Sequence, residues 1–291
     1  MNILVIGGTR FFGVPMVERL LARGHTVTLA TRGRTPDAFG ARVARLILDR
    51  QDAASIAAAL AGHSYDVAID KIAYCSNDIQ KLLPHLDCGR YILMSSASVY
   101  NPIRADTPET DFDAAAYPLV WCDRRDFDYA EIKRQAEAAL CQRFGSVPSA
   151  MVRYPVVLGR HDYTGRLRFY VEHVLRGTPM YIDDLDSRIS FIGEDEAGEF
   201  LAYLAETDFT GPVNGAAHGD VSIAELLRYI EDRTGRTAVL APEGDPAPYN
   251  GDPAQATLDV RRAEALGYAF SNLRDWIFDL IDFELRQLAG R

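Results

Sequence analysis

The chain has 291 residues, of which 48% are hydrophobic and 25% charged, enough for one large domain or a domain with an added lobe. Its formal net charge of −10 gives no general attraction for phosphate backbones, so we expect no nucleic-acid partner. No apolar run is long enough to span a membrane, and the N-terminus lacks the pattern of a secretion signal. We therefore expect a cytoplasmic protein that does not bind membranes.

The four cysteines do not form a metal-binding pattern. Cys75, Cys88, Cys122 and Cys141 lie far apart in the sequence, and none belongs to a CxxC pair or to a Cys/His ligand spacing. We therefore expect no metal site and a reduced, intracellular protein.

The first half of the chain alternates short apolar runs with segments of helical spacing. Strands are predicted in the apolar runs at residues 2–6, 25–31, 45–48, 66–69, 91–94 and 150–153. Helices are predicted between them at residues 11–22, 53–60 and 123–144. Strands that alternate with helices and are apolar on both faces indicate a Rossmann-type α/β fold with a doubly wound parallel sheet.

The pattern of the second half is looser. Helices are predicted at residues 166–176, 194–206, 223–234, 260–266 and 273–288. We expect residues 1–158 to form an NAD(P)-binding domain and residues 159–291 to form mainly a smaller, substrate-binding lobe, with some later strands and helices returning to the first domain. Such a lobe would lie over the carboxyl ends of the strands, where open α/β sheets bind ligands.

A glycine-rich turn joins the first predicted strand to the first predicted helix, the position that a dinucleotide-binding fold requires. Gly7 permits a tight turn, the amides that follow can face a pyrophosphate at the helix start, and Gly13 lets the helix pack closely on the strand. An ordinary βα turn is the alternative. The predicted cofactor contacts in this turn are Gly7, Gly8, Thr9, Arg10, Phe11, Phe12 and Gly13.

The residues after the second predicted strand favour NADP(H) over NAD(H). A site for NAD usually has an acidic residue here, whereas this chain has Arg32 and Arg34, with Arg10 on the neighbouring turn. Guanidinium groups suit a 2′-phosphate through charge and forked hydrogen bonds, although they would also be stable in solvent. Asp49, at the end of the third strand, would either meet the adenine or cap the next helix.

A serine, a tyrosine and a lysine form a candidate catalytic set. Ser96 follows the fifth predicted strand, and Tyr129 and Lys133 are spaced so that they share one face of a helix. A nearby ammonium lowers the pKa of a phenol, so Tyr129 would exchange a proton with a substrate oxygen while a hydride moves at carbon. Ser96 would hold that oxygen.

These features together resemble the short-chain dehydrogenase/reductase superfamily, most closely its extended, epimerase/dehydratase-like branch and an atypical subgroup with a GGxxxxG turn. The turn matches through Gly7, Gly8 and Gly13, and the catalytic set matches the superfamily's Ser-Tyr-Lys triad. Arg188 with the later Asp195 and Ala197, residues 211–214 and residues 258–268 are similar to further segments of the extended branch.

Two segments depart from the sugar-modifying members of that branch. Ala97 and Ser98 stand where the sugar dehydratases have Asp-Glu, which argues against dehydratase chemistry. Val156 stands where many sugar-nucleotide epimerases have a substrate-binding asparagine that valine cannot replace, which argues against a nucleotide-sugar substrate and leaves it as an alternative. The residues of this segment that we expect to contact the cofactor are Tyr154, Pro155 and Val156.

Two arginines and two tyrosines are the candidate substrate contacts. Arg166 and Arg188 would bind a phosphate or a carboxylate, or would instead pair with local acids such as Asp184 or Asp186. Tyr100 and Tyr163 would line the pocket, or would be packed aromatics.

The sequence favours a reductase that moves a hydride at a keto or carbinol carbon of a sugar-like substrate. One alternative is an epimerase that retains its NAD. Another is an RNA-associated protein, as plastid relatives of the atypical subgroup are, and a third is a cofactor sensor without turnover. The acidic charge argues against RNA binding, and the intact Ser96, Tyr129 and Lys133 set argues against a sensor. The resemblance also implies a homodimer.

Overall fold

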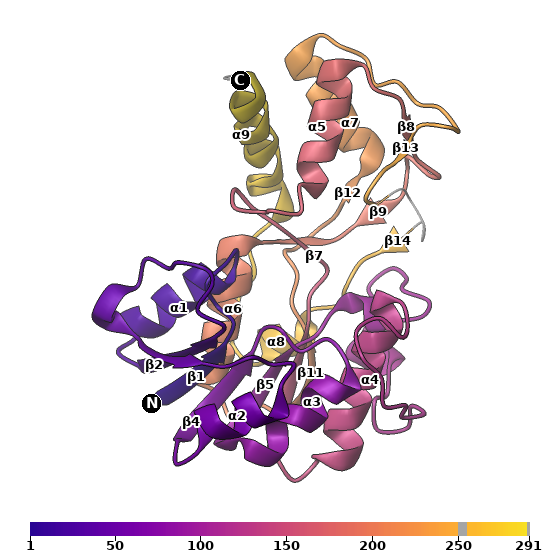
Figure 1. Cartoon of the computed structure of the whole chain (residues 1–291). Coiled ribbons are helices and arrows are strands. Elements are labelled where there is room, and N and C mark those ends of the chain that lie inside the picture. The colour runs from indigo at the N-terminus through magenta and orange to yellow at the C-terminus, as the bar shows by residue number, and fades with distance from the viewer. Residues whose placement is uncertain (250–254, 290–291) are drawn as a thin grey trace.

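The computed structural model describes residues 1–249 and 255–289 and contains a seven-stranded sheet whose paired strands are all parallel (Figure 1). The strand order is β11-β6-β5-β4-β1-β2-β3. The strands are β1 (Asn2–Ile6), β2 (Thr26–Thr31), β3 (Ala44–Ile47), β4 (Ser64–Asp70), β5 (Asp87–Met94), β6 (Ser149–Arg153) and β11 (Gly211–Asn214). This order confirms the predicted doubly wound sheet and reverses between β1 and β4, where such sheets bind ligands.

Helices cover both faces of the sheet because the strands are apolar on both sides. On one face pack α1 (Gly13–Ala22) and α6 (Glu194–Ala205), and on the other pack α2 (Ala53–Leu60), α3 (Ser76–Leu82) and α4 (Tyr129–Arg143) (Figure 1). Within β1, Ile3 and Val5 join the first core, while Leu4 and Ile6 join the second. This alternation follows from the two-residue period of a strand.

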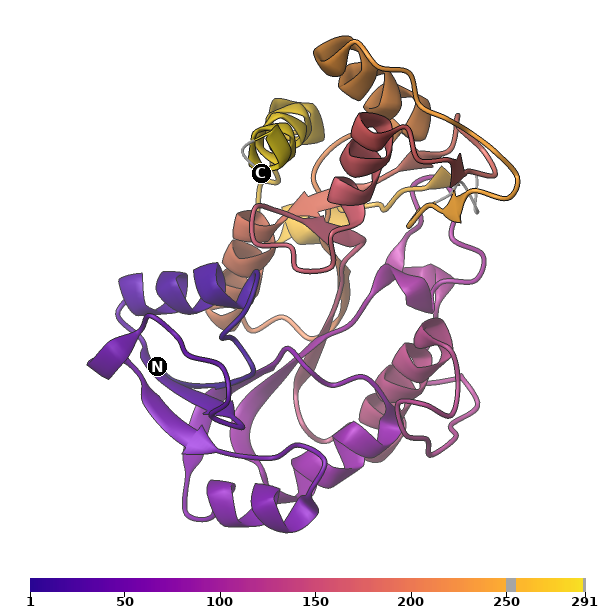
Figure 2. The same cartoon turned by 45° about the horizontal axis from the view of Figure 1, so that its top comes forward.

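A second body with its own apolar core is built from later parts of the chain (Figure 2). Its helices are α5 (Arg166–Arg176), α7 (Ile223–Thr234) and α9 (Ile277–Ala289). Its short strands are β7 (Val156–Leu158), β8 (Met180–Tyr181), β9 (Arg188–Ile189), β10 (Phe191–Gly193), β12 (Val221–Ser222), β13 (Asp245–Pro246) and β14 (Gln255–Ala256). The chain beyond residue 159 also returns to the first body, because α6 packs on α1, β11 joins the sheet and α8 (Arg261–Ala265) packs on β11.

Two helices differ from the sequence prediction. The helix expected from residue 123 begins at Tyr129, because the Asp128 side chain accepts a hydrogen bond from the Glu131 amide and caps the helix there. Helix α3 was not predicted, since it is short and polar in sequence. In the described residues, no helix is both long and apolar enough to cross a membrane.

Candidate active site

The turn after β1 takes a conformation that only glycine adopts without strain. Gly7 and Gly8 have φ of +96° and +95°, in the region that side chains with a Cβ rarely enter. A Cβ added to Gly13 would lie only 2.7 Å from the Gly8 Cα. Any side chain at position 13 would therefore clash with the backbone at the beginning of the turn. The sequence predicted that Gly13 allows a close approach of the helix to the first strand. The close approach that the structure shows is to Gly8 in the turn.

Helix α1 begins directly after this turn with its N-terminal amides uncapped by a side chain. Phe12 is the N-cap residue, and within the described residues no side chain accepts from the first amides of the helix. The first two amides of the helix donate to carbonyls of the turn, Gly13 to Arg10 at 3.1 Å and Val14 to Phe11 at 2.9 Å, whereas no acceptor in the described part of the chain takes the amides of residues 8–12. Because a helix N-terminus also carries partial positive charge, those turn amides suit a phosphate group. The local backbone therefore fits the pyrophosphate of a dinucleotide.

The predicted catalytic lysine is buried at the ends of two neighbouring strands. The Lys133 Nζ donates to the carbonyl oxygens of Ala73, at 2.8 Å, and Met94, at 3.0 Å. It lies 5.9 Å from the centre of the Tyr129 ring and 4.7 Å from that of Tyr74. Burial lowers the pKa of Lys133 to about 8, against the opposing effect of carboxylates such as Asp70. The ammonium is thus held in place from α4 by the ends of β4 and β5.

Tyr129 and Ser96 meet beside this lysine. Tyr129 is the first residue of α4 and is 46% exposed, and Ser96 follows β5 and is 9% exposed. The Ser96 Oγ accepts from the Ser98 amide at 3.2 Å, which fixes the serine in a single 3₁₀ turn. The structure therefore brings the three predicted catalytic side chains together at the carboxyl ends of the central strands.

The electrostatics of Tyr129 differ from the sequence expectation. Burial of the hydroxyl raises its pKa, and a hydrogen bond with Ser96 and the charge of Arg166 act in the opposite direction. The pKa of Tyr129 is raised overall and Lys133 is not among the largest causes, so the expectation of a lowered phenol pKa is wrong for the free protein. The physical reason is that two backbone carbonyls hold the ammonium away from the phenol.

The predicted adenosine-binding residues lie at the ends of β2 and β3. Arg32 and Arg34 are exposed, and no acid among the described residues pairs with either. Asp49 accepts from the Gln51 amide at 3.0 Å, while Asp52 is the residue that caps α2. The alternative in which Asp49 caps the next helix is therefore wrong.

Arg10 points elsewhere. Its guanidinium lies 5.4 Å from the centre of the Tyr163 ring, which packs edge-on against Phe11. The Tyr163 phenol in turn influences the pKa of Tyr129. Arg10 therefore lies beside Tyr163, and the prediction of a 2′-phosphate site depends on Arg32 and Arg34.

The segment after β6, residues 154–156, packs against Phe12 of the glycine-rich turn. The Tyr154 ring lies 6.1 Å from that of Phe12, and its hydroxyl donates to the Ala197 carbonyl at 2.7 Å. Pro155 is half-buried, and Val156 begins β7, where it pairs with Phe191. The side chain of Tyr154 is thus part of the core, which leaves the neighbouring Pro155 and Val156 as the more accessible residues of this segment.

Of the predicted substrate contacts, Tyr163 and Arg166 lie near enough to Tyr129, the predicted catalytic tyrosine, to influence its pKa. Tyr163 is 67% exposed, and Arg166 is exposed at the start of α5. The charge of Arg166 acts on Tyr129 and on the buried Tyr249. Arg166 therefore belongs to the second body but lies close to Tyr129 of the first.

The prediction that Tyr100 lines a pocket is wrong. Tyr100 is only 4% exposed, its hydroxyl donates to the Asn214 side chain at 2.5 Å, and the buried Arg153 donates to it at 3.2 Å. These polar partners keep the ring in the core.

Arg188 is paired, although not with either acid considered from the sequence. It forms an ion pair with Asp220 at 2.5 Å and lies 3.7 Å from Glu225. Its charge is therefore largely compensated within the second body.

The sequence reasoning gave no role to Lys71, although its position makes it part of the site. Lys71 follows β4, is 9% exposed, and its Nζ lies 3.9 Å from the centre of the Phe12 ring. The available signal in the sequence was the charged pair Asp70-Lys71 directly after an apolar strand.

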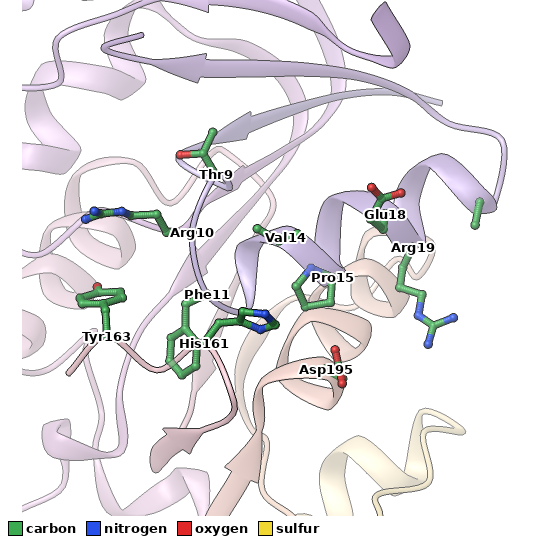
Figure 3. Close-up of a pocket in the computed structure, with 11 residues that line it drawn as sticks. Thr9, Arg10, Phe11, Val14, Pro15, Glu18, Arg19, His161, Tyr163 and Asp195 are labelled. Atoms are coloured by element: carbon green, nitrogen blue, oxygen red, sulfur yellow. The ribbon is translucent and has the colours of Figure 1, made fainter. Parts of the chain in front are cut away.

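A pocket of about 700 Å³ runs along the outer side of α1, beginning at the glycine-rich turn (Figure 3). Its lining residues come from the turn, α1, α6 and the loop after β7: Thr9, Arg10, Phe11, Val14, Pro15, Glu18, Arg19, Ala22, His161, Tyr163 and Asp195. The predicted catalytic residues are not among these, whereas the predicted cofactor contacts Thr9, Arg10 and Phe11 and the predicted substrate contact Tyr163 are.

Comparisons with known proteins agree with these features. The sequence model of the NAD-dependent epimerase/dehydratase family matches residues 3–216. The chain is 27% identical to chloroplast stem-loop binding protein of 41 kDa b from Arabidopsis thaliana, over 70% of this chain and 55% of that protein. It is 28% identical to 2′-dehydrokanamycin reductase from Streptomyces kanamyceticus, over 72% of this chain and 59% of that protein. The chain thus spans less than two thirds of the curated relatives that it matches.

Solved structures share the fold across the whole chain. UDP-glucose 4-epimerase from Thermotoga maritima has a TM-score of 0.76 and 18% identity, covering 99% of this chain and 100% of that chain. UDP-glucuronic acid 4-epimerase from Bacillus cereus has a TM-score of 0.73 and 16% identity, covering 100% and 99%. At these identities the likeness shows a common fold.

Proposed function

Because the chain belongs to the NAD-dependent epimerase/dehydratase family, we propose that it is a reductase that interconverts a ketone and a secondary alcohol on a sugar-like substrate. The observation that carries the proposal is the meeting of Ser96, Tyr129 and Lys133 at the strand ends beside the glycine-rich turn. The uncapped start of α1 and the positive-φ glycines fit a dinucleotide at this place.

The chemistry divides between the cofactor and the chain's own residues. The reduced cofactor supplies a hydride to the carbonyl carbon when it is bound. The Tyr129 hydroxyl donates a proton to the carbonyl oxygen, and Ser96 donates a hydrogen bond to the same oxygen as its negative charge grows. The raised pKa of Tyr129 keeps the phenol protonated at neutral pH, which suits a proton donor in the reductive direction.

An anionic group on the substrate would explain the placing of Arg166. This arginine is exposed at the start of α5, close enough to Tyr129 to influence its pKa, and no acid in the described part of the chain forms an ion pair with it. A guanidinium binds a phosphate or a carboxylate through two parallel hydrogen bonds. We therefore propose a keto sugar that carries a phosphate, a carboxylate or a nucleoside diphosphate.

The proposed preference for NADP(H) has a direct test in Arg32→Ala. We expect the dissociation constant of NADP⁺ to rise about tenfold or more, because a charge-assisted hydrogen bond contributes about 1.5–3 kcal/mol. The dissociation constant of NAD⁺ should stay within twofold, since NAD⁺ lacks the 2′-phosphate. Calorimetric titration of both cofactors measures the effect, and equal losses for the two would contradict the preference.

The catalytic assignment is tested with Tyr129→Phe. Removing the proton donor should lower kcat by about 10²–10⁴-fold while the dissociation constant of NADP⁺ changes little. The assay follows NADPH consumption over a panel of keto sugars, keto sugar phosphates and nucleotide-linked keto sugars, with Tyr229→Phe in α7 as the matched control. Wild-type activity in Tyr129→Phe would show that the proposed mechanism is wrong.

The second candidate is an epimerase that retains its NAD, which the shared fold with two sugar-nucleotide epimerases favours. Such an enzyme returns the hydride to the same sugar and needs no external reductant. Mass spectrometry of the nucleotide that co-purifies with the protein separates the two. Stoichiometric NAD would favour the epimerase, and an empty or NADP(H)-exchanging protein would favour the reductase.

A further inference from the structure

Lys71 stands at the point where the order of the strands reverses. It directly follows β4, and its amide donates to the Ile6 carbonyl at the end of β1 at 3.1 Å. The strands β1 and β4 are paired in the centre of the sheet, and the strand order changes direction between them. Ligands of open α/β sheets bind in the crevice outside the carboxyl ends of such strands.

The side chain of Lys71 lies on the same side of the sheet as α1. A Cβ built on Gly7 would lie 3.6 Å from the Lys71 Cβ, so the lysine packs against the glycine-rich turn itself. Its Nζ then reaches Phe12, the N-cap residue of α1, at 3.9 Å from the ring centre. The ammonium therefore lies against the side chain of the N-cap residue of that helix, beside the glycine-rich turn.

Lys71 is buried without a carboxylate partner. It is 9% exposed, and in the described part of the chain it forms neither an ion pair nor a side-chain hydrogen bond, only the contact with the Phe12 ring. The adjacent Asp70 is already engaged by Arg50 at 2.5 Å and Tyr91 at 2.7 Å. Those partners belong to the opposite face of the sheet, because successive side chains of a strand alternate.

Two independent features thus favour an anion at one place. The turn before α1 offers the amides of residues 8–12, which no acceptor in the described part of the chain takes, beside the partial positive charge of the helix N-terminus. Lys71 offers a buried cation that has no counter-charge among the same described residues. A buried cation is destabilising unless it is paired, and an ion pair shielded from water is stronger than one at the surface. A bound anion would relieve that cost.

We propose that Lys71 binds the pyrophosphate of the dinucleotide cofactor. This inference rests on the proposed function only in assuming that a dinucleotide binds at the turn. In the free protein the Phe12 ring holds the ammonium, and on binding the ammonium turns from the ring to a phosphate oxygen. Lys71 is therefore a cofactor-binding residue in addition to the backbone of the turn.

The experiment compares Lys71→Met with Lys81→Met, because Lys81 lies in a nearby helix but is paired with Asp123 at 3.6 Å. The titrants are NADP⁺, 2′-phospho-ADP-ribose, which keeps the pyrophosphate but lacks nicotinamide, and 2′-AMP, which lacks both. In Lys71→Met we expect the first two dissociation constants to rise about tenfold or more and that of 2′-AMP to stay within twofold. Lys81→Met should match the wild type for all three. If the wild type prefers NAD⁺, then NAD⁺, ADP-ribose and adenosine replace them.

Each other outcome contradicts the proposal in a distinct way. Unchanged affinity of Lys71→Met for all three ligands would show that the lysine does not contact the cofactor. Equal losses for all three would indicate a structural role, and a loss for NADP⁺ alone would place the contact at the nicotinamide half. Lys71→Gln repeats the test with a polar side chain should the methionine variant not fold. If the wild type binds no dinucleotide at all, the proposed function fails first, and the two failures are thereby distinguished.

Discussion

Two buried lysines at the ends of the central strands differ in how their charges are satisfied. Lys133 has two carbonyl acceptors, and carboxylates raise its pKa against the effect of burial. Within residues 1–249 and 255–289, the Lys71 ammonium contacts only an aromatic ring, and burial is the cause that lowers its pKa to about 8. In the free protein, the buried charge of Lys71 thus lowers the free energy of unfolding. A bound anion would remove this destabilisation, since ligands that bind only the folded state stabilise it.

The destabilisation by the charged form of Lys71 predicts that the free energy of unfolding depends on pH. Each pKa unit corresponds to about 1.4 kcal/mol, so a fall from 10.5 to about 8 corresponds to on the order of 3 kcal/mol. The folded-state pKa is lowered, so the charged lysine destabilises the fold fully below pH 8. The penalty disappears as the pH rises from 8 to 10.5, where the unfolded chain also loses its proton.

Without cofactor, Lys71→Met should therefore be more stable than the wild type at pH 7, and the difference should shrink toward pH 10. Urea denaturation of both proteins at the two pH values measures the difference in unfolding free energy. Lys133 has a similarly lowered pKa but is present in both proteins, so its contribution cancels. A methionine variant that is less stable than the wild type at pH 7 would argue that the lysine is satisfied in the free protein.

At the scale of elements, the position of the cofactor turn depends on the packing of α6 against α1. Gly198 of α6 lies against the first turn of α1, where an added Cβ would come 2.6 Å from the Met16 nitrogen and 2.7 Å from the Phe12 carbonyl oxygen. These atoms are backbone and cannot move alone. Part of the chain distant in sequence thus supports the helix whose N-terminus faces the proposed pyrophosphate.

Gly198→Ala is therefore expected to push α6 and α1 apart. Overpacking of this kind destabilises by about 1–3 kcal/mol, and the shift of α1 should also weaken NADP⁺ binding. The control is Gly193→Ala at the start of the same helix, where an added Cβ would meet only Trp276, at 3.9 Å. Urea denaturation and calorimetric titration test both effects. Unchanged stability in Gly198→Ala would mean that the two helices adjust freely.

At the scale of the whole molecule, the net charge of −10 opposes binding to nucleic acid. One relative is named a stem-loop binding protein, but this chain spans 55% of its length. Lysine and arginine total 31 residues against 41 acidic ones, and many of the arginines are paired with acids. Little basic charge is therefore left for a phosphate backbone.

We accordingly expect no binding of a stem-loop RNA tighter than about 100 µM at physiological salt, the weak end of non-specific affinities. Fluorescence anisotropy of a labelled stem-loop measures this, with NADP⁺ titration of the same sample as the control for active protein. Saturable binding in the low micromolar range that weakens steeply with salt would contradict the expectation and revive the RNA-associated alternative.

The sequence by itself determined the local features of this protein. The apolar runs predicted six strands of the sheet, and the glycine spacing predicted the turn, because a strand, a helix and a tight turn depend on residues close in sequence. The spacing of Tyr129 and Lys133 placed them in one helix for the same reason, although the cap at Asp128, and not the apolar pattern, set where that helix begins.

Only the tertiary structure decided which polar groups are free to act. Tyr100 is bound by Asn214 and Arg153, and Arg188 by Asp220, each through contacts between segments far apart in the chain. Lys71 became a candidate for the opposite reason, because folding buries it beside the glycine-rich turn and no acid of the described residues pairs with it. Pairing and burial depend on the packing of distant segments, which local sequence patterns do not encode.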